Sequence, residues 1–324
     1  MREAIINFPK QFLFKPEIEN GGKLKLAKFK KFIVCGMGGS HLSGDLVRTW
    51  KPAINIIIHS DYGLPPINHH NKGNTLIIAS SYSGNTEEAI DAFKTAIKSK
   101  IPVAAISTGG KLLELAQKYR VPYIKLQNDG IQPRMATGLG FRALLKVLGE
   151  EKALIESGKL AYSLKSIKLE NKGRGLAKKL KGFVPVIYSS QRNSAIAYNW
   201  KIKFNETGKI PAFYNVLPEL NHNEMTGFDV KAGTRGLSKK NYFIFLRDAE
   251  DHPRILKRMS ILKKLYNDRG LIVETIDIKG STRFHKIFSS LLLADWTAYY
   301  TALGYSVDSE QVPMVEEFKK LIIK

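Results

Sequence analysis

The stretch S-S-Y-S-G-N-T-E-E at residues 80–88 decides the fold prediction for this chain. An apolar run at residues 75–79 precedes it and is typical of a buried strand, and the residues after it have helical spacing. The sequence therefore predicts a strand, a hydroxyl-rich turn and a helix N-terminus. Gly84 permits a sharp backbone turn, and we expect Asn85 or Thr86 to cap the first helical amides.

The hydroxyl groups of this turn favour an anion site. Ser81, Ser83 and Thr86 lie close to the N–H groups at the positive end of the predicted helix. A phosphomonoester dianion fits such a site without a lysine. Taken alone, the motif fits equally well with an ordinary loop whose Ser and Thr side chains cap the helix.

A second loop, G-M-G-G-S at residues 36–40, follows another short apolar run at residues 31–35. Gly38 and Gly39 allow a ligand to approach the backbone closely, and Ser40 opens the next predicted helix. A dinucleotide site is disfavoured, because the third spaced glycine is missing and the next strand does not end in an acid placed for a ribose.

Together the two loops resemble those of the sugar isomerase (SIS) domain, whose members bind phosphosugars. The resemblance implies an α/β fold with a mainly parallel sheet between layers of helices. It also implies substrate-binding roles for six residues of the two loops: Gly38, Gly39, Ser40, Ser81, Ser83 and Thr86.

Composition is that of a soluble globular protein with about two domains, since the chain has 324 residues, 44% of them hydrophobic and 25% charged. Apolar runs stay short of the roughly 20 residues that span a bilayer, so we expect no membrane partner. A signal-peptide pattern is not evident, and the single cysteine, Cys35, cannot form an intramolecular disulfide. We therefore expect a cytoplasmic protein.

The formal net charge is +22, and residues 159–209 hold twelve Lys or Arg against two acids. Such a face can attract nucleic acid or any polyanion. Zinc-finger spacing, an RNP-like aromatic motif and a basic low-complexity tail are missing, so we expect a solvated basic surface rather than a nucleic-acid partner. Its potential would help to attract an anionic substrate.

Alternating strand and helix patterns predict two parallel sheets flanked by helices, with a first domain at residues 1–150 and a second at 182–324. The lysine-rich helical stretch 151–181 is expected to connect them. Residues 188–193 follow the first strand of the second half and replace its glycine loop, so we expect a degenerate repeat with one phosphate site. Strands are expected at 31–35, 54–59, 75–79, 103–107, 122–126, 184–188, 241–246 and 271–276, and helices near 111–119, 132–148, 194–205, 253–267, 284–303 and 312–323.

Two motifs of the second half carry groups for acid–base chemistry. N-E-T-G-K-I-P-A at residues 205–212 places Glu206 near a helix C-terminus, against the dipole preference of an acid. The plain alternative is a surface glutamate offset by Lys203 or Lys209. L-N-H-N-E-M-T-G at residues 220–227 contains a histidine, which is commonly just a hydrogen-bonded loop residue.

These motifs resemble those of the bifunctional phosphoglucose/phosphomannose isomerases, namely N-E-N-A-K-x-P-A and H-N-E. The last helix, V-P-M-V-E-E-F-K-K at residues 312–320, resembles the helix that carries their active-site lysine, and P-R at 133–134 also matches. Departures are T-G in place of N-A at 207–208 and two candidate lysines. Lys319 is preferred to Lys320 because it directly follows the apolar Phe318, as in the helix of that family.

The resemblance implies an aldose–ketose isomerase that moves a proton between C1 and C2 of a sugar phosphate through a cis-enediol(ate). It assigns proton transfer to Glu206, charge stabilisation to Arg134, and ring opening to His222 and Lys319. It also implies a homodimer in which the partner supplies His222, and no metal or other cofactor.

Three alternatives remain at this stage. One is a phosphosugar-sensing SIS protein that has lost catalysis, although Glu206 and His222 are both present. Another is an isomerase of a different sugar phosphate. The isomerase part of an amidotransferase is disfavoured, because we find no N-terminal domain with a cysteine nucleophile.

Overall fold

The computed structural model describes residues 1–23 and 26–322. Contacts divide the chain into an N-terminal unit, Ile6–Leu164, and a C-terminal unit, Met1–Ile5 with Lys165–Lys324. Because residue 323 is outside the described part, the expected end of the last helix, 312–323, is also outside it. Within that part, no helix combines the length and apolar character needed to cross a membrane.

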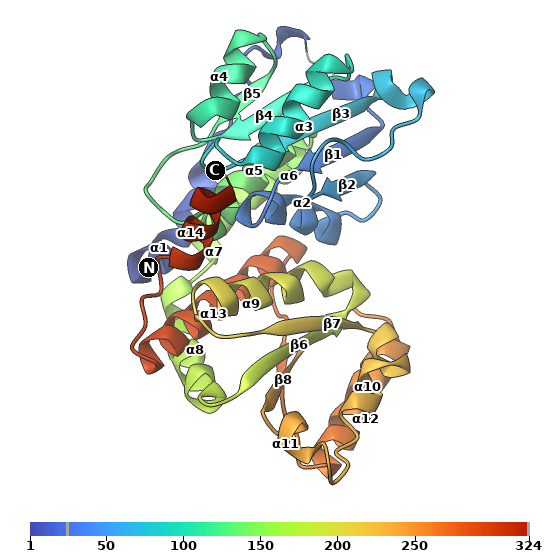
Figure 1. Cartoon of the computed structure of the whole chain (residues 1–324), viewed down its shortest axis with the longest axis vertical. Helices are drawn as coiled ribbons and strands as arrows, with labels where there is room; N and C mark the ends of the chain where they lie inside the picture. Colours follow the sequence, from blue (N-terminus) through green and yellow to red (C-terminus); the bar gives the residue numbers. More distant parts are fainter. Residues whose placement is uncertain (24–25, 323–324) are drawn as a thin grey trace. The chain divides into compact units, whose positions relative to one another are not determined.

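The N-terminal unit contains a parallel sheet in the order β2-β1-β3-β4-β5 (Figure 1). Its central strands are fully buried apolar runs, which explains why their positions were predictable. Because the strands are parallel, the loops after neighbouring β1 and β3 leave the sheet at the same edge. The strands are β1 (Lys31–Cys35), β2 (Ile56–His59), β3 (Thr75–Ser80), β4 (Val103–Ser107) and β5 (Tyr123–Lys125).

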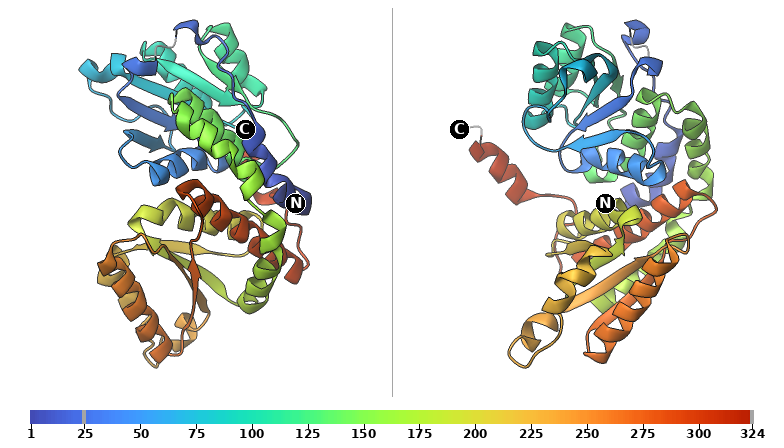
Figure 2. Two further views of the ribbon diagram at one scale, coloured as in Figure 1. Left: turned by 180° about the vertical axis from the view of Figure 1, so that it is seen from behind. Right: turned by 90° about the vertical axis from the view of Figure 1, so that its right-hand side faces the viewer.

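Two layers of helices cover this sheet (Figures 1 and 2). Alternate strand residues such as Ile33 and Ile77 form one core with α3 and α4, which pack together. The intervening residues, among them Val34, meet α2, which packs on α5. The helices of the unit are α2 (Gly39–Trp50), α3 (Glu87–Lys98), α4 (Gly110–Lys118), α5 (Thr137–Val147), α6 (Glu151–Gly158) and α7 (Leu160–Ser163).

The C-terminal unit repeats this plan with a four-stranded parallel sheet in the order β7-β6-β8-β9. Strand β6 lies between β7 and β8 as β1 lies between β2 and β3, so the expected repeat is confirmed in its strand order. Strand β7 was not predicted, because it is an edge strand whose first two residues, Phe213 and Tyr214, are exposed aromatics. The strands are β6 (Val184–Ser190), β7 (Phe213–Leu217), β8 (Asn241–Arg247) and β9 (Ile272–Asp277).

Long helices complete the C-terminal unit, and α13 lies along α8 in each view (Figures 1 and 2). Helix α12 covers one face of the sheet, and α9 and α13 pack together on the other. The helices are α8 (Ser166–Leu180), α9 (Ser194–Glu206), α10 (Glu224–Gly227), α11 (Arg235–Ser238), α12 (Pro253–Asp268), α13 (Arg283–Gly304) and α14 (Pro313–Ile322), while the short α1 (Arg2–Asn7) starts the chain.

Candidate active site

The turn between β3 and α3 is built around the buried hydroxyl of Ser81. Its Oγ accepts the backbone N–H groups of Gly84 at 3.0 Å and Thr86 at 3.4 Å, and lies 2.8 Å from Thr86 Oγ1. Gly84 has φ +75°, and a Cβ there would lie 1.8 Å from the Gly109 carbonyl oxygen. Glycine is therefore required at position 84, both for the backbone conformation and for space.

The predicted capping of α3 by these side chains is wrong. Thr86 is the N-cap residue, but its hydroxyl caps no helical amide and instead meets Ser81. Asn85 Oδ1 accepts the backbone N–H of Lys111 at 3.1 Å. Because the cap side chains are engaged elsewhere, the first-turn amides that a cap would occupy stay available to an anion.

The glycine loop after β1 packs against both this turn and the segment that carries Arg134. Ser40 Oγ accepts the Tyr82 backbone N–H at 2.9 Å. A Cβ on Gly39 would lie 2.7 Å from the Pro133 carbonyl carbon and 2.8 Å from the Arg134 nitrogen. The structure thus brings the predicted residues of the N-terminal unit together at one edge of the sheet.

Gly38 and Arg134 occupy defined places in this group. Gly38 precedes α2 with φ +49°, a conformation that glycine adopts without strain. Arg134 lies in a 3-10 turn, Pro133–Met135, that leads into α5, and its side chain is only 1% exposed. A buried guanidinium remains charged, so it can stabilise negative charge at this edge.

The loop after β4 supports this turn, although the sequence alone did not predict that role. Thr108 Oγ1 donates to the Tyr82 carbonyl at 2.7 Å, and the Leu112 backbone N–H donates to the Gly84 carbonyl at 2.9 Å. The T-G-G sequence at residues 108–110 was the available signal. This third strand-end loop fixes the Ser81-centred turn from the side of β4.

Glu206 is the last residue of α9, as expected, and its side chain is half-buried. The Lys203 carbonyl accepts the N–H groups of both Thr207 at 2.9 Å and Gly208 at 3.0 Å, which ends the helix. Lys209 adopts φ +58°, and its Nζ donates to the Glu206 carbonyl at 2.6 Å. The turn that carries Glu206 is therefore held by backbone and side-chain bonds.

His222 ends a 3-10 turn, Glu219–His222, and is exposed. Two residues later, the Glu224 carboxylate accepts hydrogen bonds from the Tyr188 hydroxyl of β6 and the Asn215 amide of β7. Burial raises the pKa of the Tyr188 hydroxyl, and the nearby Glu224 carboxylate raises it further. Glu224, whose role was not predicted from the sequence, anchors the segment that carries His222.

Lys319 lies on α14, none of whose described residues is buried. Its Nζ lies 2.7 Å from Glu316 Oε1, one turn earlier on the same helix. The segment before α14 is fixed at two points, because Lys209 Nζ donates to the Gln311 carbonyl and the N-terminal amine pairs with Glu310. Lys209 therefore connects the Glu206 turn to the segment that leads to Lys319.

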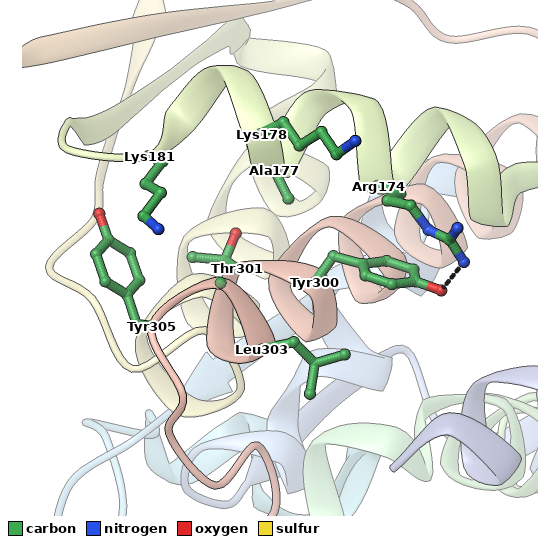
Figure 3. A pocket seen from close by; sticks show the side chains of 9 residues that line it. Arg174, Ala177, Lys178, Lys181, Tyr300, Thr301, Leu303 and Tyr305 are labelled. Carbon is green, nitrogen blue, oxygen red and sulfur yellow. Dashed lines mark hydrogen bonds between the residues drawn. The ribbon is translucent and has the colours of Figure 1, made fainter.

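Two surface pockets of the C-terminal unit lie away from these residues. One, of about 330 Å³, lies between the C-terminal ends of α8 and α13 (Figure 3). Arg174 lies over the Tyr300 ring there, with its guanidinium carbon Cζ 4.6 Å from the ring centroid. Its Nη2 donates to the Tyr300 hydroxyl at 2.6 Å. The other lies between α12 and β9. Neither is lined by a predicted site residue.

Comparisons with known proteins agree with this arrangement. Residues 169–322 match the family described as bacterial phospho-glucose isomerase C-terminal SIS domain. A bifunctional phosphoglucose/phosphomannose isomerase of Aquifex aeolicus is 33% identical over 92% of this chain and 92% of its own length. The chain belongs to the bifunctional phosphoglucose/phosphomannose isomerase family.

Membership of this family confirms the resemblance inferred from the loop and motif sequences. A second family member, from Caldicellulosiruptor bescii, is also 33% identical and covers 98% of each chain. The fold agrees with the C-terminal domain of a glucosamine-fructose-6-phosphate aminotransferase from Francisella tularensis, at TM-score 0.68, 14% identity and 96% coverage of each chain. The fold prediction of two SIS-type domains is confirmed.

Proposed function

We propose that the protein interconverts glucose 6-phosphate or mannose 6-phosphate with fructose 6-phosphate through a cis-enediol(ate). The observation that carries this proposal is the position of Glu206 at the end of α9, in a turn fixed by the Lys203 carbonyl and Lys209. An acid held at the negative end of a helix dipole is a poor structural choice but a suitable proton acceptor.

Substrate binding in this proposal begins at the N-terminal unit. The phosphate is bound by the first-turn amides of α3 and by the hydroxyls of Ser83 and Thr86, with Ser81 shaping the turn from below. Gly38 and Gly39 let the sugar approach the backbone of the neighbouring loop, and Ser40 borders it. Such a site supports binding of the 6-phosphate that all three sugars share.

Isomerisation then needs one base and one group that stabilises charge. The Glu206 carboxylate removes the proton from C2 of the aldose and returns it to C1, and the reverse reaction uses the same path. Negative charge develops on O1 and O2 of the intermediate, and the Arg134 guanidinium stabilises it. A single carboxylate serving both carbons explains how one site produces both aldoses, provided that the intermediate rotates about C2–C3.

Ring opening precedes this step for a cyclic substrate. We assign it to His222 and Lys319, which transfer protons to the ring oxygen and from the O1 hydroxyl. His222 is supplied by the second subunit of a homodimer in this scheme. We also place the enzyme in the cytoplasm, where sugar phosphates are made and consumed.

The test compares the wild type with Glu206→Gln, which keeps the shape of the side chain and removes the base. Both isomerase activities should fall together by about 10²–10⁴-fold, because general-base catalysis typically contributes that much. In deuterated water, wild-type enzyme given fructose 6-phosphate should place deuterium at C2 of both aldoses. Loss of only one activity would mean that two bases operate.

Two other functions remain to be separated by the same measurements. A phosphosugar sensor would bind fructose 6-phosphate but show no turnover in the wild type. An isomerase of another sugar phosphate would show turnover with its own substrate and little with these three. Coupled assays on all three hexose phosphates distinguish these outcomes.

A further inference from the structure

The edge of the second sheet holds a buried carboxylate between cations. Asp248 directly follows β8 and is 0% exposed. Arg283 Nη1 donates to its Oδ2 at 2.7 Å, and Lys286 Nζ donates to its Oδ1 at 2.9 Å. The backbone N–H of Glu250 also donates to Oδ1, at 3.2 Å. Both carboxylate oxygens are therefore held by charge-assisted hydrogen bonds.

The loops around Asp248 are closed by further polar contacts. Asp251 accepts hydrogen bonds from Ser190 Oγ at 2.7 Å and Asn193 Nδ2 at 3.2 Å, so the loop after β8 is joined to the loop after β6. Arg283 Nη2 donates to Asn193 Oδ1 at 2.8 Å. Arg283 thus contacts the loops after both strands, with Nη2 toward Asn193 and Nη1 toward Asp248.

This position corresponds to the phosphate loop of the N-terminal unit. In each sheet the first strand along the chain, β1 or β6, pairs with the strand that precedes the loop in question, β3 or β8. Arg283 is the first residue of α13, and Arg134 lies three residues before the start of α5. The first copy has hydroxyls and glycines after β3, whereas the second has the acids of D-A-E-D at residues 248–251.

We propose that Asp248 is a built-in anion. Its carboxylate occupies, within the C-terminal unit, the position that corresponds to the substrate phosphate in the N-terminal unit. Arg283 and Lys286 then form a retained anion cradle that is occupied from within. This limits each chain to one phosphate site. The correspondence rests on the proposed phosphate loop, but the test below measures stability and is independent of catalysis.

Removing the carboxylate should open the cradle to anions from solution. Asp248→Ala leaves a cavity of carboxylate size beside Arg283, which loses its carboxylate partner, and Lys286, whose Nζ keeps a second partner in Glu250 Oε1 at 2.7 Å. Removing one partner of a buried ion pair is strongly destabilising. Formate has the size and charge of the group removed, and phosphate is the larger probe. An anion that binds only the folded variant raises its melting temperature in proportion to the logarithm of its concentration.

The experiment is a thermal unfolding series at constant ionic strength with formate and with phosphate. The added anion should raise the melting temperature of Asp248→Ala by on the order of 3 °C or more beyond the rise that it causes in the wild type. Asp277→Ala is the matched control, because that carboxylate also ends a strand and lies 2.6 Å from Arg247 Nε and 3.6 Å from Lys279 Nζ. The partners of Asp277 are exposed to solvent, so the anions should raise the melting temperature of Asp277→Ala no more than that of the wild type.

A second pair of measurements covers the case in which Asp248→Ala folds poorly. Its refolding yield from urea should rise with formate, and Asp248→Ala with Arg283→Met should lose that response because the cradle has lost a cation. Equal anion responses in Asp248→Ala, Asp277→Ala and wild type would overturn the proposal. An undiminished response in the double variant would also overturn it. If instead the loop at residues 81–86 does not bind the phosphate, variants of that loop should bind fructose 6-phosphate as tightly as the wild type does.

Discussion

Lys203 Nζ lies 2.5 Å from Asp295 Oδ1, and both side chains are only 1% exposed. The pair joins α9 to α13 one turn before Glu206. Trp200 Nε1 adds a second bond between the same helices, to Ser290 Oγ at 3.0 Å. Because the Lys203 carbonyl also ends α9, this buried pair fixes the position of the turn that carries Glu206.

Breaking the pair should lower both stability and turnover. Asp295→Asn leaves the Lys203 charge buried without its partner, which typically costs about 3–5 kcal/mol of unfolding free energy. Urea denaturation would measure this, and kcat should fall with little change in KM. Lys203→Met with Asp295→Leu should recover most of the stability, since apolar replacements of buried pairs are often neutral. A single variant as stable and active as wild type would contradict the role of the pair.

The phosphate loop predicts a change in KM for fructose 6-phosphate. Ser83→Ala with Thr86→Ala removes two hydroxyl donors to a dianion, and each hydrogen bond to a charged group is worth about 1.5–3 kcal/mol. KM should therefore rise at least about tenfold, while the free energy of unfolding falls by no more than the roughly 1 kcal/mol of the lost Thr86–Ser81 hydrogen bond. Ser260→Ala, on the exposed face of α12, is the control. An unchanged KM in the loop variant would remove the phosphate from this turn.

The two lysines of α14 can be separated by substitution. Lys319→Ala should slow turnover of the cyclic substrate, because ring opening needs its proton transfer, whereas Lys320→Ala should not. Steady-state rates on glucose 6-phosphate measure both. The reverse pattern would shift the assignment by one residue, and two active variants would exclude α14 from catalysis.

The proposed homodimer predicts complementation between inactive variants. If each site combines Glu206 of one subunit with His222 of the other, a mixed dimer of Glu206→Gln and His222→Ala subunits contains one intact site. Refolding the two variants together at equal amounts should restore about a quarter of wild-type activity, since half of the dimers are mixed and one of their two sites works. Activity that stays at the level of the separate variants would place both residues on one subunit.

Stability should depend on pH through Asp248. Burial alone would raise the pKa of this carboxyl, but the Lys286 hydrogen bond and the charges of Lys286 and Arg283 lower it below 3.8 overall. The unfolded state then binds more protons, so the stabilisation is complete above the ordinary pKa and is lost as pH falls through the lower folded value. The gap in urea midpoint between wild type and Asp248→Asn should shrink below about pH 4. A gap that widens toward acid would contradict this.

Much of the fold followed from the sequence alone. Apolar runs bounded by glycine-rich turns gave β1 and β4 with the bounds that the structure shows, because central parallel strands are apolar throughout. The loops at residues 36–40 and 80–86 were recognised for a similar reason. Their glycines serve local backbone needs that any sequence with this turn must meet.

Other features depended on residues far apart in the chain. Strand β7 forms only because its backbone pairs with β6, and its exposed aromatics carry no alternating pattern. The Thr86 hydroxyl meets the buried Ser81 hydroxyl rather than a helical amide, and local sequence did not show which of these two partners it takes. Asp295 and Asp248 were not predicted at all.

Local pattern therefore determined most of the strands and helices, though not β7, and it indicated which loops can meet an anion. Tertiary structure decided the partners of the buried charges, since Lys203 meets Asp295 and Asp248 meets Arg283 only when distant helices and strands pack together. A buried charge must find a counter-charge wherever the fold supplies one, and the spacing of residues along the chain carries no record of that partner.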